Sequence, residues 1–415
     1  MHIAHRSCCA LVCAALYFTL TSVAVQATPL VPSHDDEVIE VLPAITGSRA
    51  EERRQRKLLA QQPRDPALAL GIATRYLAQA HELGDPRFAG MAMSAIDGWK
   101  DESTMPDGVL MMRATLLQYL HDFDASVRSL EVLLRRPSTE PRSQAWLTLA
   151  TVRRVQGRYA DSDIACKQVA ASGAALHADA CLAENAGLRG EVDRARSIFA
   201  RLRADTRTPA STQIWLTTSL AELEQRAGRA DAANAAFRAA LQLGSDAYTT
   251  LAYADFLIDQ KRPIEALGLL KSQPRSDAVL LRLAIAGTQV VAKAARGTGQ
   301  GEADESIAQS GGTAQVNLDV SEMRERIALA NERPDAKLFH GREQAMFALW
   351  VERQPVYALE LARTNVAQQR EPLDLLVLAQ TARAAGRRDA LEQARRITSQ
   401  MGLRDQRIDA VLGRG

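Results

Sequence analysis

The stretch AWLTLATVRRVQGRYADS, which begins at Ala145, decides the fold because its pattern returns three times before Gln273. The later copies are ACLAENAGLRGEVDRARSIFA from Ala180, IWLTTSLAELEQRAGRADAANAAF from Ile214 and TLAYADFLIDQKRPIEALGLL from Thr250. In each copy an apolar segment with helical spacing ends in a short polar turn, and a second helical segment starts at once. The turns are marked, at steps of 33, 38 and 33 residues, by Gly157, Gly190, Gly228 and Lys261. This spacing predicts a repeated pair of helices.

The same turn marker recurs outside this stretch, at Gly84, His121, Arg353 and Gly386. A period of about 34 residues with two helices per unit is typical of stacked helical repeats. A small side chain follows most of the markers by five residues, which lets two helices approach closely: Ala89, Ser126, Ser162, Ala195, Ala233, Ala266 and Ala358. The predicted fold class is therefore all-α, an α-α superhelix built as a helical-repeat solenoid.

The repeat resembles the tetratricopeptide repeat (TPR), whose units carry Trp, Leu and Gly on the first helix, Gly and Tyr at the turn, and Ala and Phe on the second helix. The matching residues are Trp146, Leu149, Gly157, Tyr159, Ala195, Phe199, Ala233 and Phe237. The resemblance covers about residues 66–403 and is strongest in the middle units. Lys261 and Arg353 depart from it by replacing the turn glycine, and Ala150 replaces the glycine of the first helix. The resemblance implies a concave face, lined by the first helix of each unit, that holds a protein or peptide.

Residues 1–27 have the features of a secretory signal peptide. The start is positive at Arg6, an apolar run extends from Cys8 to Leu20, and Ala27 ends a cleavage site of small residues. We therefore predict an exported bacterial repeat protein, cleaved after Ala27 and periplasmic or secreted. The alternative is an uncleaved inner-membrane anchor formed by residues 7–27, which are barely long enough to span a bilayer.

The remaining chain divides into an extended arm and N-terminal helix (28–64), repeats (65–276), an interrupted repeat (277–332), C-terminal repeats (333–403) and a polar tail (404–415) that caps or frays. Asp65-Pro66 and Asp85-Pro86 predict helix starts, because Asp is a good N-cap and Pro fits the first helical position. Residues 296–315 contain five glycines and no apolar periodicity. We predict that they form a flexible insertion between the two helices of one repeat, with Asp319 capping the second. Nine units are predicted in total.

Charge and motifs argue against several classes of function. Loss of Arg6 with the signal peptide lowers the formal net charge from +2 to +1, and the one basic cluster, RAEERRQRKLL from Arg49, is interrupted by two glutamates. A nucleic-acid surface needs a sustained basic stripe, so no nucleic-acid partner is predicted. The sequence has no histidine at metal-ligand spacing, no nucleophile elbow and no Walker lysine. We predict no metal, no cofactor, no catalysis, and no membrane span after signal cleavage.

The predicted partner-binding residues lie on the side of the first helices that faces away from the core. Their charged and aromatic side chains would orient and anchor a ligand; they are Tyr119, Arg154, Glu184, Trp215, Glu222, Arg226, Tyr248 and Asp255. The predicted function is an exported scaffold or adaptor that binds a protein or peptide partner on its concave face. Two alternatives stay open: an accessory subunit of an envelope enzyme or assembly machine, and a solenoid enzyme.

Cys166 and Cys181 are the only cysteines that remain after signal cleavage. An exported protein meets an oxidising compartment, in which disulfides form. The two cysteines are seven or eight residues from the turn between neighbouring units, so antiparallel helices would place them at the same height. This predicts a disulfide. The alternative is a free thiol, because Cys166 is at a core position that Phe199 occupies in the next unit.

Overall fold

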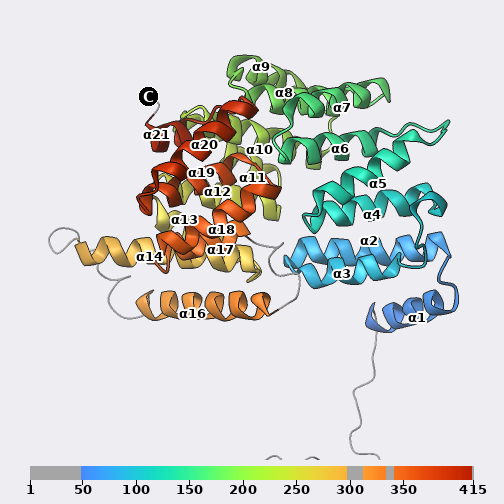
Figure 1. The fold of residues 1–415 in the computed structure, drawn as a ribbon, viewed down its shortest axis with the longest axis horizontal. Coiled ribbons are helices and arrows are strands. Elements are labelled where there is room, and N and C mark those ends of the chain that lie inside the picture. The colour runs from blue at the N-terminus through green and yellow to red at the C-terminus, as the bar shows by residue number, and fades with distance from the viewer. Residues whose placement is uncertain (1–47, 297–311, 333–340, 414–415) are drawn as a thin grey trace, which may run out of the picture. The chain divides into compact units, whose positions relative to one another are not determined.

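The computed structural model describes residues 48–296, 312–332 and 341–413. The predicted signal peptide and arm in residues 1–47 lie outside the described residues, as do residues 297–311 of the predicted insertion. The chain forms two compact units, Met1–Glu51 and Glu52–Gly415, and the description below concerns the second. Every regular element in the described ranges is a helix, which confirms the predicted all-α class (Figure 1).

The helices pack in consecutive pairs that stack into a superhelix. Nine pairs are present among the described helices, from α2 with α3 to α19 with α20, and the pair α14 with α16 encloses the insertion (Figure 1). The bounds are α1 Ser48–Gln61, α2 Pro66–Leu83, α3 Pro86–Ala95, η1 Glu102–Thr104, α4 Asp107–Tyr119, α5 Phe123–Arg135, α6 Ser143–Val155, α7 Tyr159–Ala171, α8 Ala175–Leu188, α9 Val192–Arg203, α10 Ala210–Arg226, α11 Ala230–Leu243, α12 Ala247–Asp259, α13 Pro263–Leu270, α14 Asp277–Arg296, α16 Gly312–Asn331, α17 Gly341–Trp350, α18 Pro355–Gln368, α19 Pro372–Ala384, α20 Arg388–Met401 and α21 Gln406–Leu412.

A left-handed residue makes the turn inside the pairs. The backbone φ angle is positive at all eight sequence markers: Gly84, His121, Gly157, Gly190, Gly228, Lys261, Arg353 and Gly386. Glycine adopts this conformation without a steric penalty. His121, Lys261 and Arg353 adopt it with φ of 61°, 59° and 58°, although it costs a residue with a Cβ roughly 1–2 kcal/mol. The packing of the helix pair therefore enforces the turn even where the sequence departs from glycine.

The small side chain that follows seven of the eight turns lies where the two helices of a pair touch. All seven of these residues are fully buried: Ala89, Ser126, Ser162, Ala195, Ala233, Ala266 and Ala358. The two serines also join the helices, because the Ser126 hydroxyl donates to Ala114 O and the Ser162 hydroxyl donates to Ala150 O, both at 2.8 Å. Close approach and hydrogen bonding thus coincide at one position of the repeat.

The interrupted repeat begins its second helix earlier than predicted. α16 starts at Gly312, so residues 312–315 are helical rather than part of the insertion. Asp319, predicted to cap this helix, lies inside it, is 4% exposed and pairs with Arg275 at 3.0 Å. The physical reason is that α14 is 20 residues long and needs a partner of equal length; Val316 packs against its Gly287.

Most of the C-terminal tail is helical, because α21 covers Gln406–Leu412. Asp405 caps α21 by accepting from the Arg407 backbone N–H at 3.0 Å. Ile408 and Leu412 are each 2% exposed and pack in the core that includes α19. These two apolar residues lie four positions apart, so they share one face of the short helix and cover the last repeat.

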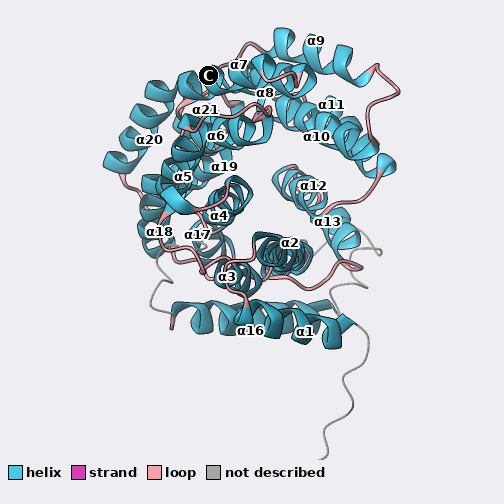
Figure 2. Ribbon diagram, turned by 90° about the vertical axis from the view of Figure 1, so that its right-hand side faces the viewer, coloured by secondary structure: helices cyan, strands magenta, loops and turns pink. Residues whose placement is uncertain are grey.

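The superhelix returns upon itself, and this closure is not encoded in the repeat pattern. The Arg370 backbone N–H donates to Val155 O at 2.7 Å, and the Arg404 N–H donates to Leu188 O at 2.9 Å. These bonds join the C-terminal repeats to the carbonyl ends of α6 and α8. Figure 2 shows the helices arranged around a common centre, with α12 and α13 on one side and α17 and α18 on the other.

Some turn glycines serve this closure as well as the local turn. A Cβ placed on Gly190 would lie 2.9 Å from Arg404 Cγ, and one on Gly157 would lie 2.8 Å from Met401 Cε. Gly228 likewise faces the Gln406 side chain. The C-terminal segment around α21 therefore rests directly on the turns of three middle repeats.

One described helix is long and apolar enough to cross a membrane when judged by length and composition alone. It is α14, over Asp277–Ala295, with a mean hydropathy of 1.5. Half of this stretch is buried inside the protein, against α12, α13, α16 and α17. Its Arg282 is buried too and pairs with Asp255 at 2.6 Å. In this fold α14 is a core helix.

Candidate binding site

A cavity of about 330 Å³ lies between the middle repeats and the C-terminal repeats. One wall comes from α6, α8, α10 and α12, and the facing wall from α17, α19 and α21. Six of the eight predicted partner-binding residues line it: Arg154, Glu184, Glu222, Arg226, Tyr248 and Asp255. The facing wall supplies Arg342, Glu343, Glu371, Leu373 and Arg407. The concave face is thus one wall of a two-sided cavity, where an open groove was expected.

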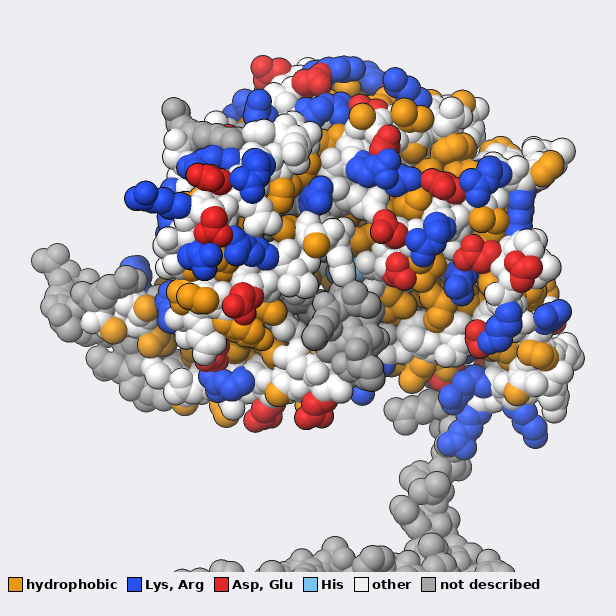
Figure 3. Space-filling view, viewed as in Figure 1, with side chains coloured by type: hydrophobic (Ala, Val, Ile, Leu, Met, Phe, Trp, Pro, Cys, Tyr) orange, Lys and Arg blue, Asp and Glu red, His pale blue; other side chains and the backbone are white. Residues whose placement is uncertain are grey.

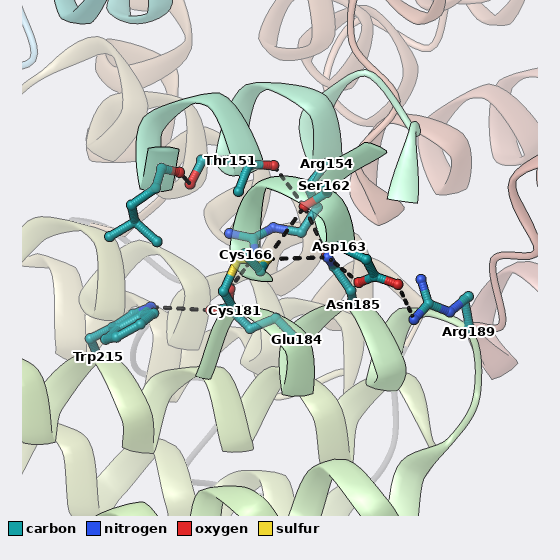
Figure 4. The surroundings of a disulfide bond; sticks show 12 residues. Thr151, Arg154, Ser162, Asp163, Cys166, Cys181, Glu184, Asn185, Arg189 and Trp215 are labelled. Carbon is teal, nitrogen blue, oxygen red and sulfur yellow. Dashed lines mark hydrogen bonds and ion pairs between the residues drawn. A yellow bond between two sulfur atoms is a disulfide. The ribbon is translucent and has the colours of Figure 1, made fainter. Parts of the chain in front are cut away.

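Glu184 is the centre of a hydrogen-bonded cluster in the first wall (Figure 4). Its carboxylate pairs with Arg154 and accepts hydrogen bonds from the Trp215 indole N–H at 3.1 Å and the Ser219 hydroxyl at 2.8 Å. Trp215 also stacks on His177, with ring centroids 5.9 Å apart. These partners occupy the carboxylate oxygens of Glu184 and hold its side chain in place.

Tyr248 and Glu222 form the most accessible feature of the cavity. The Tyr248 hydroxyl donates to Glu222 at 2.6 Å, and 64% of the Tyr248 residue surface is exposed. Burial raises the pKa of Glu222, against the opposing charge of Arg226. The negative charge of Glu222 in turn is the main cause that raises the pKa of Tyr248 well above its ordinary value, so the hydroxyl remains a donor. An exposed aromatic ring beside a carboxylate is a suitable anchor for a ligand.

The facing wall contains a charged cluster around Arg342. Its guanidinium pairs with Glu371 at 2.8 Å and with the fully buried Asp374 at 3.3 Å. Asn365 and Gln369 donate to the same Asp374 oxygen at 2.8 and 3.0 Å. Burial raises the pKa of Asp374 to about 6, although the Arg342 charge opposes the shift. This network fixes the position of Arg342 and Glu371 at the cavity.

Two polar groups in the cavity have no partner in the part of the chain that the structure describes. Arg226 makes no hydrogen bond or ion pair there, and its Nε is buried. The Tyr159 hydroxyl is buried without a hydrogen-bond partner, and the residue is 3% exposed. Burial raises the Tyr159 pKa above its ordinary range, so this hydroxyl keeps its proton. Both groups are therefore free donors.

The other two predicted residues lie elsewhere. Trp215 borders the cavity through Glu184, but its ring is partly buried against the core of α8 to α10, whereas the prediction placed it facing outward into the groove. Thr217, predicted as the first inward residue, is fully buried. The Tyr119 hydroxyl donates to Ala80 O at 2.9 Å, and the ring lines a separate cavity of about 430 Å³ beside His81. The structure does not bring Tyr119 to the other residues.

The structure joins Cys166 of α7 to Cys181 of α8 by a disulfide, with Cα atoms 5.8 Å apart (Figure 4). Both residues are fully buried. One turn after Cys181, Asn185 donates to the Ser162 hydroxyl at 2.9 Å and to Asp163 at 2.8 Å. The bridge and these bonds hold α8, which carries Glu184, against the preceding repeat.

The described side chains offer neither a cluster of metal ligands nor, on the face drawn in Figure 3, a large area of one charge. In the described ranges no group of three His, Cys, Asp or Glu side chains could hold a metal ion. On the face in Figure 3, basic and acidic side chains are interspersed. The charges in the cavity are mixed in the same way, which favours a ligand with several kinds of polar group over a polyanion or polycation.

Comparison with known proteins finds similar solved structures but no matching sequence. No family model and no curated protein matches the sequence. Among solved structures the chain is similar to a tetratricopeptide repeat protein from Parabacteroides merdae, with 15% identity over 63% of this chain and 91% of that chain and a TM-score of 0.41. It is similar to a Rap protein complexed with competence and sporulation factor, with 10% identity over 85% and 92% and a TM-score of 0.45. It is also similar to the P58(IPK) TPR domain, with 16% identity over 83% and 95% and a TM-score of 0.24. These likenesses concern the fold alone.

Proposed function

We propose that this TPR-like superhelix is an exported, non-catalytic scaffold that binds a protein or peptide partner in the cavity between its middle and C-terminal repeats. The observation that carries the proposal is Tyr248: a ring that is 64% exposed while standing in a cavity of about 330 Å³. Exposed aromatic side chains surrounded by fixed charges are typical of binding surfaces. The charges here are fixed by one another, as the Arg282–Asp255 pair at 2.6 Å illustrates.

The shape of the cavity restricts the form of the partner. Walls on two sides, joined by the Arg370–Val155 and Arg404–Leu188 backbone bonds, leave no room for a folded domain. An extended segment, with its side chains directed to opposite sides in alternation, can contact both walls at once. We therefore propose that the partner inserts a short unfolded segment or chain end.

Tyr248→Ala should abolish capture of the partner while leaving the fold intact. Because most of the ring is exposed, the substitution should change the free energy of unfolding by less than about 1 kcal/mol, mainly through the lost hydrogen bond to Glu222. The measurement is quantitative mass spectrometry of proteins retained from envelope extract, alongside chemical denaturation of each variant.

Tyr357→Ala is the matched control, because Tyr357 of α18 is 45% exposed and does not line the cavity. A protein enriched by the wild type and by Tyr357→Ala, but lost with Tyr248→Ala, supports the proposal. Equal retention by Tyr248→Ala would show that the partner binds at another surface.

Export should leave Thr28 as the mature N-terminus, because the small-residue site ends at Ala27. Intact-mass measurement of the protein from its native cells tests this directly. A chain that retains residues 1–27 and sediments with membranes would replace cleavage by the anchor alternative.

A further inference from the structure

We infer that Tyr159 and Arg226 form an oxyanion subsite in the cavity, which receives an acidic group of the ligand. This inference rests on the proposed binding function and specifies the chemistry of one end of the ligand. The shared chemistry is an anionic oxygen group, supplied by a carboxylate of a peptide or by a free anion.

Arg226 is the cation of the cavity that makes no ion pair or hydrogen bond within the described ranges, and Glu222, four residues earlier on α10, acts on it only as an opposite charge. The other charged groups of the lining each have at least one partner. Arg154 pairs with Glu184, Arg282 with Asp255, Arg342 with Glu371 and Glu343, Arg407 with Asp405, and Glu222 accepts from Tyr248. A guanidinium whose Nε is buried without an acceptor is costly unless something else satisfies it. Its planar set of donors matches the two oxygens of a carboxylate or phosphate.

Tyr159 supplies the second donor from a different helix. It is the first residue of α7, whereas Arg226 is the last residue of α10, and both line the same cavity. Among the charged groups that act on the pKa of Tyr159, Arg226 has the largest influence. The hydroxyl has no partner in the described structure, so it is free to donate to a ligand oxygen in the cavity that Arg226 also lines.

Among the leading charges that act on Tyr159, arginines outnumber acidic residues. Arg154 and Arg189 also act on Tyr159 as positive charges, each being paired with an acidic residue, Glu184 and Asp163 respectively, and Glu371 is the one acidic group among the leading influences on Tyr159. Glu371 is neutralised by Arg342 at 2.8 Å. Glu222, four residues before Arg226 on the same helix, is held by the Tyr248 hydroxyl at 2.6 Å. An incoming oxyanion therefore meets two free donors and more positive than negative charges among the leading influences on Tyr159.

Anion-dependent thermal stabilisation of the full mature chain tests the subsite. The probes are inorganic phosphate, acetate, and an N-acetylated tripeptide with a free C-terminal carboxylate, compared with its C-terminal amide, at constant ionic strength set with chloride. At about ten times its Kd an anion should raise the Tm of the wild type by about 2 °C. Arg226→Met and Tyr159→Phe should each remove that increase. Both side chains lack partners, so both variants should fold; circular dichroism checks this.

Arg396→Met is the matched control, because Arg396 is an exposed arginine of α20 outside the cavity. Stabilisation by phosphate or by the peptide acid that is lost in Arg226→Met and kept in Arg396→Met supports the subsite, and the more effective probe identifies the source of the oxyanion. The subsite is overturned if no anion stabilises the wild type more than chloride, or if Arg226→Met responds as the wild type does. In that case loss of partner capture by Tyr248→Ala would still support the binding function, so the two proposals fail separately.

Discussion

Opening the Cys166–Cys181 bridge should lower the free energy of unfolding by about 3 kcal/mol, because the bridge closes a loop between residues 15 positions apart. The cross-link restricts the unfolded chain, and its loss also frees α8 from the preceding repeat. Both sulfur atoms are buried, so the bridge should resist mild reductant until the protein is partly unfolded. Denaturant unfolding of oxidised and fully reduced protein, under otherwise identical conditions, measures the difference.

The bridge can be checked before any stability is measured. Alkylation of unreduced, exported protein in denaturant should label neither Cys166 nor Cys181, whereas reduced protein should be labelled at both. Two reactive thiols in the unreduced protein would mean that Cys166 is a buried free thiol, the alternative that the sequence left open. Equal unfolding curves with and without reductant would contradict the stabilising role.

Ile408→Ala should destabilise the protein by roughly 2–5 kcal/mol, the range for a buried isoleucine cut back to alanine. Ile408 is 2% exposed and fixes α21 in the core. The same helix carries Arg407, which lines the cavity, and follows Arg404, whose N–H bonds to Leu188 O. The variant should therefore loosen one cavity wall and weaken partner binding as well as stability.

Ile164→Ala is the matched control for that experiment. Ile164 of α7 is 59% exposed, so the same chemical change should alter the free energy of unfolding by no more than about 0.5 kcal/mol. If Ile408→Ala were equally mild, α21 would be a loosely attached tail, and the closure of the superhelix would lose its support.

The sequence was sufficient for the repeat itself, because local interactions between adjacent helices define it. Turn markers and the small residues behind them predicted where the first helix of a pair ends and the second begins, including turns at His121 and Lys261 that lack glycine. The helix starts at Asp65 and Asp85 were also readable: their carboxylates accept from the backbone N–H groups of Leu68 and Arg87. These contacts lie within a few residues of each other.

Closure of the superhelix could not be read in the same way. It depends on small rotations between successive repeats that accumulate along the stack. The sequence contains no local pattern that predicts the backbone bond between Arg404 and Leu188 or the one between Arg370 and Val155. For the same reason only one of the two walls of the cavity was predicted from the sequence. The concave wall followed from the positions of residues on the first helices. Arg342 and Glu371 belong to C-terminal repeats, which resemble the TPR pattern only weakly and reach the concave wall through long-range contacts.

Tyr159 and Trp215 show the limit of assigning one role to one repeat position. Tyr159 matched the turn tyrosine of the family and was not among the predicted partner-binding residues, yet it lines the cavity and its hydroxyl has no partner in the described structure. Trp215 was expected to point into the groove. Its ring is instead partly buried next to the cavity, because it donates a hydrogen bond to Glu184 and stacks on His177, both on α8. A signal for both existed in their polar atoms, which need partners when buried.

Site-specific photo-crosslinking tests most directly whether the cavity is the partner-binding site. A benzophenone amino acid at position 248 keeps an aromatic ring in the cavity, and the same residue at position 357 reports on the outer face. Irradiation in native cells, followed by mass spectrometry, should give an adduct between position 248 and one short segment of a partner, with none at position 357. An adduct at position 357 without one at position 248 would contradict the account.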